Sequence, residues 1–167
     1  MRKTFYVFLD IDGVLWDWQF IRQQVEQGKL KRGGLIETFN PDSIKAIDNL
    51  LYGLEKQYNV KLVLSSTWRY EMDTAVRTLK RNGFEHFARM DATPITRKPE
   101  CRGQEILMYL EDKPQPYDFV VIDDEMYDFA ECFDLSHLIK THIYSASLNQ
   151  GQVDEFLQQK TFDGVEL

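Results

Sequence analysis

The chain has 167 residues, 43% of them hydrophobic and 13% aromatic, which is the composition of a globular domain and excludes a disordered chain. Its formal net charge of −7 argues against tight binding of duplex nucleic acid, which usually needs a basic surface. It contains no run of about 18 apolar residues, so we expect no membrane span. Cys101 and Cys132 lack metal-ligand spacing and are expected to be reduced thiols, which favours a cytoplasmic protein. We expect residues 1–167 to form a single domain.

An apolar run at residues 5–9 predicts a buried strand, and a pair of carboxylates follows it directly. Asp10 and Asp12 leave the strand end, and Gly13 allows the backbone to turn sharply after them. One carboxylate can attack phosphorus and form an acyl-phosphate, while a second can protonate the leaving oxygen and then activate water. The same motif occurs in calcium loops and in plain turns, but a calcium loop is flanked by helices and needs further oxygen ligands. The motif therefore favours phosphoryl transfer, with a plain turn as the alternative.

Residues 16–39 are polar and rich in aromatic side chains, and they include a turn signal at Gly33 and Gly34. The segment is too short for an independent cap domain, which usually needs about 50 residues, so we expect only a small flap. A site without a cap is open and suits a large substrate, although a partner subunit could also close it; nothing in the sequence indicates an oligomer. The aromatic residues of the flap could stack on a base or sugar, or could pack the flap on the body: Trp16, Trp18 and Phe20.

A strand-like run at residues 60–64 and an apolar run at residues 119–122 predict two more strands that end in polar side chains. Ligands of an open α/β sheet bind outside the carboxyl ends of its strands, so these side chains are expected to meet there. Hydroxyls can hold phosphoryl oxygens, and carboxylates are ligands that magnesium prefers. The polar residues concerned are Ser65 and Ser66 after the first run, and Asp123, Asp124 and Asp128 after the second.

Apolar residues at helical spacing alternate with these strands along the chain. Asn40 as N-cap and Pro41 in the first turn begin one helix, and Gly83 ends another that starts near residue 70. The alternation predicts an α/β fold, a doubly wound, Rossmann-like three-layer sandwich around a central, mostly parallel sheet. The other predicted elements are a helix over 102–110 that turns Ile106, Leu107 and Leu110 inward, a short helix over 126–132, a strand over 138–143, and a final helix capped by Asn149.

In the order of these motifs the chain resembles the haloacid dehalogenase (HAD) superfamily of phosphatases, from about Phe5 to Phe156. Residues 10–15 match the first HAD motif, Asp-x-Asp-Gly followed by Val or Thr and then Leu, without a departure. The other matches are Ser65, or Ser66 one position later, for the second motif, and Asp123, Asp124 and Asp128 for the fourth.

The third HAD motif, a Lys or Arg at the start of a helix, has two candidates, Arg102 and Lys98. The stretches at 64–69 and 122–125 look most like the small HAD domains of RNA-repair-like proteins. In that subgroup an Arg shortly before a Glu-Ile pair is the commoner pattern. The resemblance therefore favours Arg102.

The resemblance implies a capless phosphatase that hydrolyses phosphomonoesters through an aspartyl-phosphate, with Mg²⁺ as its cofactor. The expected substrate is a nucleotide or a nucleic-acid terminal phosphate; a phosphoprotein or another small metabolite is one alternative, and an inactive phosphate-binding module is a second. Arg69 is expected to contact phosphate as well, because its guanidinium offers bidentate geometry. The implied roles are Asp10 as nucleophile, Asp12 as general acid and base, Asp10, the backbone carbonyl of Asp12, Asp123 and Asp124 as metal ligands, Ser65 or Ser66 with Arg102 or Lys98 on the phosphate oxygens, and Asp128 steadying the metal ligands from behind.

Overall fold

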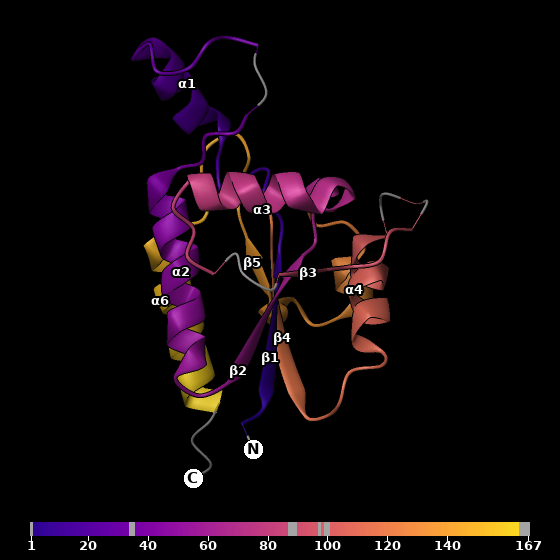
Figure 1. Ribbon diagram of the computed structural model, residues 1–167. Coiled ribbons are helices and arrows are strands. Elements are labelled where there is room, and N and C mark those ends of the chain that lie inside the picture. Colours follow the sequence, from indigo (N-terminus) through magenta and orange to yellow (C-terminus); the bar gives the residue numbers. More distant parts are fainter. Residues whose placement is uncertain (1, 34–35, 87–89, 97, 99–100, 164–167) are drawn as a thin grey trace.

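A central sheet of five parallel strands, in the order β3-β2-β1-β4-β5, organises the computed structural model (Figure 1). The structure describes residues 2–33, 36–86, 90–96, 98 and 101–163. The predicted α/β fold is confirmed, and the sheet is parallel at every strand pair described, where a mostly parallel sheet was expected. The strands are β1 (Thr4–Leu9), β2 (Asn59–Leu64), β3 (Asp91–Ala92), β4 (Tyr117–Asp123) and β5 (Leu138–Lys140).

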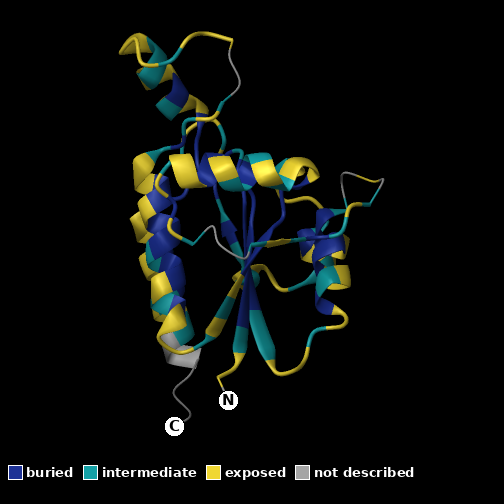
Figure 2. Cartoon of the chain, in the orientation of Figure 1, coloured by how far each residue is buried: buried dark blue, intermediate teal, exposed yellow. Residues whose placement is uncertain are grey.

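Helices cover both faces of the sheet, and the alternation of side chains along β1 supplies both cores. Phe5, Val7 and Leu9 enter the larger core, which holds the buried faces of α2 and α6. Tyr6 and Phe8 enter the smaller core, under α4 and α5. Figure 2 shows the buried residues along the sheet and on the inner helix faces. None of the described helices has the length and apolarity to cross a membrane. The elements named here are α2 (Pro41–Glu55), α4 (Arg102–Leu110), α5 (Phe129–Cys132) and α6 (Gln150–Asp163).

The helix ends follow the capping signals. The side chain of Asn40 accepts a hydrogen bond from the backbone of Asp42 at 3.0 Å, and Pro41 is the first residue of α2. Gly83, at φ +83°, follows the end of α3 (Met72–Arg81), which is preceded by a 3-10 turn, η1 (Thr67–Glu71). A second 3-10 turn, η2 (Leu135–His137), precedes β5.

One inward-facing residue was predicted wrongly. Leu107 is 40% exposed, whereas Ile106 and Leu110 are buried in the core under α4. Ile106 and Leu110 stand four residues apart and share one face of the helix, and residue 107 lies about 100° further round.

The predicted flap contains a helix, α1 (Trp18–Glu26), which projects beyond α3 (Figure 1). Asp17 caps α1 by accepting from the backbone of Phe20 at 2.9 Å, and its other oxygen accepts from the Ser147 hydroxyl at 2.7 Å. Of the flap aromatics that were expected either to stack on a substrate or to pack on the body, Trp16 is buried against the body, whereas Trp18 is 41% exposed. Gly34, at the far end of the predicted flap, lies outside the described residues.

Candidate active site

The register of the sheet brings three strand ends together. Leu9 pairs with Leu64 on one side and with Ile122 on the other. The ladder continues one residue further, because the amide of Asp10 donates to Ile122 at 3.0 Å and the amide of Ser65 donates to Leu9 at 2.8 Å. The polar residues that follow β1, β2 and β4 therefore share one edge of the sheet, as the sequence predicted.

Gly13 makes the turn after Asp12 possible. Its φ of +76° lies in the left-handed region that favours glycine. A Cβ at this position would also lie 2.5 Å from Cγ of Asp124, which is far inside van der Waals contact. The absence of a side chain thus lets the first loop approach the acidic end of β4.

Asp10, Asp123 and Asp124 form a compact acidic cluster, with one carboxylate oxygen of each within 4.8 Å of the others. Burial raises the pKa of Asp10 to about 7, although Arg102 and the Ser66 hydroxyl act in the opposite direction. Burial, reinforced by the charge of Asp10, also holds the pKa of Asp123 well above its usual range. Oδ2 of Asp123 is buried and has no hydrogen-bond partner among the described residues. Three close carboxylates with an unpartnered oxygen fit a hard divalent cation such as Mg²⁺.

We expect the stabilisation of the protein by Mg²⁺ to grow as the pH rises. With the pKa of Asp10 at about 7 in the folded chain, against about 4 in an unfolded one, the metal-free folded protein binds more protons between these values. Its stability therefore falls as the pH rises through this window, and the carboxylates freed of protons become available to the cation. Thermal unfolding at about pH 5 and about pH 8, with and without Mg²⁺, measures the effect; equal shifts at both values would contradict it.

Arg102 brings positive charge to the cluster. It is the first residue of α4 and is buried, and its Nη1 lies 4.0 Å from Oδ1 of Asp10 and donates to the carbonyl of Ser65. The guanidinium carbon also lies 5.0 Å from the centre of the Tyr127 ring. Lys98, the other candidate for the third-motif cation, is exposed and precedes the helix. Of the two candidates, the structure places Arg102 beside Asp10.

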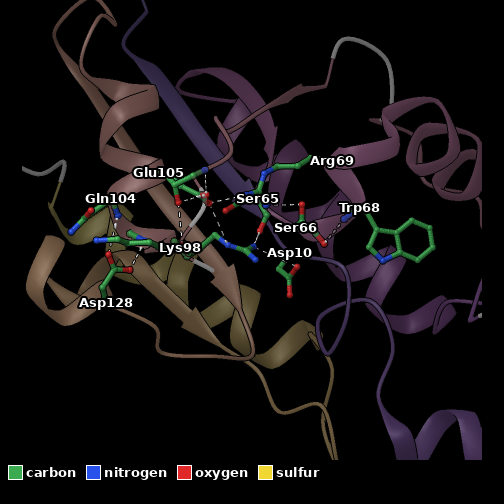
Figure 3. Close-up of polar contacts among 12 residues, drawn as sticks. Asp10, Ser65, Ser66, Trp68, Arg69, Lys98, Gln104, Glu105 and Asp128 are labelled. Atoms are coloured by element: carbon green, nitrogen blue, oxygen red, sulfur yellow. Dashed lines mark hydrogen bonds and ion pairs between the residues drawn. The ribbon is translucent and has the colours of Figure 1, made fainter. Parts of the chain in front are cut away.

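Arg69 lies differently from the sequence-based expectation. Its guanidinium is buried and pairs with Glu105 at 2.8 Å, and it donates to the carbonyl of Ser66 at 2.8 Å (Figure 3). Glu105 also lies 3.7 Å from Nε of Arg102. Both terminal nitrogens are engaged inside the protein, where Arg69 ties the loop after β2 to α4.

Asp128 is likewise turned toward α4. Its carboxylate accepts from the backbone amides of Gly103 at 2.6 Å and Gln104 at 3.1 Å. Both oxygens thus satisfy the free amides at the start of the helix that carries Arg102. The resemblance implied that Asp128 steadies the metal ligands from behind, whereas its contacts place it at the start of the helix that carries Arg102.

The hydroxyls of the two serines after β2 differ in their hydrogen bonding. The Ser66 hydroxyl lowers the pKa of Asp10 and accepts a hydrogen bond from the backbone of Trp68 at 3.4 Å. The Ser65 hydroxyl is buried and has no hydrogen-bond partner among the described residues. Of the two candidates for the second motif, Ser66 is thus the one whose hydroxyl lowers the pKa of Asp10.

The sequence analysis missed the partners of Asp12. Its Oδ1 accepts from the indole nitrogens of Trp16 at 2.9 Å and Trp68 at 3.1 Å, and Trp68 also lies 3.2 Å from Oδ2. The only signal for Trp68 was its place two residues after Ser66. That signal does not reveal which way the indole points.

Two hollows share one lining residue, Ile36. The first, of about 550 Å³, is lined by Asp12 and both indoles that bind it. The second, of about 640 Å³, lies on the flap and is lined in part by basic side chains. The basic residues of this flap groove are Arg22, Lys31 and Arg32.

Comparison with known proteins agrees with the strand-end motifs. A family model described as the HAD domain in Swiss Army Knife RNA repair proteins matches residues 6–153. Among solved structures, a haloacid dehalogenase-like family hydrolase from Streptococcus pneumoniae is similar, with 17% sequence identity, a TM-score of 0.46, and coverage of 92% of this chain and 90% of that one. The search of curated proteins found no match. Because the family model spans all the strand-end motifs, the chain belongs to the HAD domain family of Swiss Army Knife RNA repair proteins.

Proposed function

We propose that the protein is a Mg²⁺-dependent phosphomonoesterase that works through an aspartyl-phosphate on a nucleic-acid terminal phosphate. The observation that carries the proposal is the position of Asp10. Its carboxylate stands within an acidic cluster that suits a cation, and the guanidinium of Arg102 lies 4.0 Å away. A nucleophile between a metal site and a fixed positive charge is an arrangement that phosphoryl transfer requires.

In the first step a carboxylate oxygen of Asp10 attacks phosphorus, and the bond from phosphorus to the leaving oxygen breaks. Asp12 transfers its proton to that oxygen, so the leaving group departs as a neutral alcohol. Arg102 and the hydroxyl of Ser66, or that of Ser65, hold the equatorial oxygens, where negative charge spreads in the transition state.

In the second step Asp12, now ionised, takes a proton from water as the water attacks the phosphorus of the aspartyl-phosphate. Inorganic phosphate leaves and Asp10 is regenerated. Mg²⁺ held by Asp10, the backbone carbonyl of Asp12, Asp123 and Asp124 would reduce the repulsion between the nucleophile and the phosphate.

Two observations support a nucleic-acid end as the substrate. The family model is named for RNA repair proteins. The flap groove, which shares Ile36 with the hollow at Asp12, also holds Arg22, Lys31 and Arg32 against one acidic residue, Glu26, in a chain whose net charge is −7. A strand whose terminal phosphate lay at Asp10 could pass Ile36 and place its next phosphates against these cations, whereas a mononucleotide would leave them unused.

A substrate panel tests this function. We expect hydrolysis of single-stranded oligonucleotides with a 5′- or 3′-terminal phosphate to exceed that of mononucleotides, phosphopeptides and a generic aryl phosphate. All activity should require Mg²⁺ and stop on addition of a chelator. Phosphate release that continues in the presence of the chelator would contradict the proposed requirement for Mg²⁺. A preference for phosphopeptides would contradict the proposed nucleic-acid substrate.

Removing positive charge from the flap tests whether the flap groove binds the part of an oligonucleotide beyond its terminal phosphate. Changing Arg22, Lys31 and Arg32 together to Gln should raise KM for the oligonucleotide and flatten its salt dependence by about 2 in log–log slope, at about 0.7 for each phosphate that is no longer neutralised. The matched control changes three exposed lysines around the opposite end of the sheet to Gln and alters the net charge equally: Lys3, Lys56 and Lys61. If both triple variants respond alike, the strand does not use the flap groove.

A further inference from the structure

The carboxylate of Asp12 is held by indoles from two separate parts of the chain. Trp16 stands four residues further along the same loop, whereas Trp68 belongs to η1 and is 56 residues away. Their nitrogens converge on one atom, Oδ1, at 2.9 and 3.1 Å, and the contact from Trp68 to Oδ2, at 3.2 Å, is the longest of the three. Oδ1 therefore has the N–H of Trp16 to itself, and the two oxygens share the N–H of Trp68.

The chemistry of the donors is suited to a group that must both give and take a proton. An indole N–H donates and cannot accept, and it carries no charge. It can therefore bond to Asp12 in the acid form and in the base form, whereas a Lys or Arg in its place would favour the ionised form. In the acid form one oxygen carries the proton and the other remains an acceptor. Because Trp16 donates to Oδ1 alone, Oδ1 is the better-satisfied acceptor and Oδ2 is the oxygen left to carry the proton.

Ring packing alone does not account for this arrangement. The ring of Trp68 packs against that of Phe39 with 5.8 Å between centroids, and the ring of Trp16 packs against that of Trp18 at 5.2 Å. A phenylalanine would preserve much of such packing without any N–H group. Both indoles also line the same hollow of about 550 Å³ as Asp12, which is where a leaving group must lie if Asp12 protonates its oxygen.

We propose that Trp16 and Trp68 are positioning residues that hold Asp12 so that Oδ2 faces the leaving oxygen as proton donor. The proposal rests on the acid–base role of Asp12 in the proposed function. It makes the two indoles part of the mechanism, although neither touches the phosphorus.

The test compares leaving groups. An activated aryl phosphate departs without much protonation, whereas an alkyl phosphate needs the general acid, so only the latter should depend on how Asp12 is held. We expect Trp68→Phe and Trp16→Phe each to lower kcat/KM for the alkyl ester by about 10- to 100-fold, the scale of one hydrogen bond to a charged group, and for the aryl ester by less than about twofold. kcat/KM is the appropriate constant because it reports on events up to departure of the leaving group.

Tyr52→Phe is the matched control, because it removes the hydrogen bond from an exposed aromatic residue of α2 to the carboxylate of Glu85, and Tyr52 does not line the hollow at Asp12. It should leave both esters unaffected. Equal losses on both esters in the Trp68 and Trp16 variants, or a fall in melting temperature that tracks the lost activity, would show that the indoles only stabilise the fold.

Asp12→Asn distinguishes failure of this inference from failure of the proposed function. That variant should show the same dependence on the leaving group, and more strongly. If it does and the tryptophan variants do not, the indoles have no positioning role. If Asp12→Asn itself shows no such dependence, the acid–base role is wrong and the inference falls with it.

Discussion

Asp10→Asn should lower turnover by about four orders of magnitude or more, which is the scale seen when an enzyme loses its catalytic nucleophile. The amide is a poor nucleophile, and the change also removes one of the three carboxylates of the acidic cluster. An acid-quenched reaction should trap a phosphorylated protein from the unchanged chain and none from the variant. Wild-type-like turnover, or a trapped phosphoprotein in the variant, would rule out the covalent mechanism.

The stability of the same variant is its internal control. Asp10 is buried beside Asp123, and burial raises its pKa to about 7, so at about pH 8 the folded metal-free protein carries an ionised group that its surroundings disfavour. A neutral amide removes this penalty. We therefore expect the metal-free variant to melt at a higher temperature than the unchanged protein near pH 8. A variant that is inactive and more stable cannot owe its inactivity to unfolding.

Arg102→Ala should lower turnover by at least about a hundredfold, the scale of losing one preorganised charge contact in an active site. The guanidinium is buried, lies 4.0 Å from Asp10, and is carried by the first turn of a helix packed into the core. A group held by a rigid element contributes more to catalysis than a mobile one, because positional error reduces the rate steeply. Since Arg102 also lowers the pKa of Asp10, the acid side of the pH–rate profile should move to higher pH in the variant.

Lys98→Ala is the matched comparison, because it removes a side chain of the same charge that was the other candidate for the third motif. Lys98 is exposed and stands outside α4, so we expect its loss to change turnover far less and to act mainly through substrate affinity. The opposite ranking would mean that the third-motif cation is Lys98, and the assignments of Asp10 and Asp12 would be unaffected.

Much of this molecule could be predicted from the sequence because the deciding signals are local. An apolar run followed by a carboxylate or hydroxyl is a pattern of only a few consecutive residues. The parallel register of the sheet then brings Asp10, Ser65 and Asp123 together at the carboxyl ends of the strands. Asn40 and Gly83 mark helix ends by backbone conformation and capping, which depend little on distant residues. The fold class, the strand ends and the acidic cluster follow from such signals.

Tertiary structure decided which of several equivalent side chains enter the site, because that depends on partners far away in the sequence. Arg69 was expected to contact phosphate in addition to Arg102, but Glu105 on α4 engages its guanidinium inside the protein. Asp12 is bonded to Trp68, 56 residues away, and no spacing rule predicts that the indole nitrogen points toward the carboxylate. Local patterns specify elements and their ends, whereas the direction of a side chain is set by the packing of elements against one another.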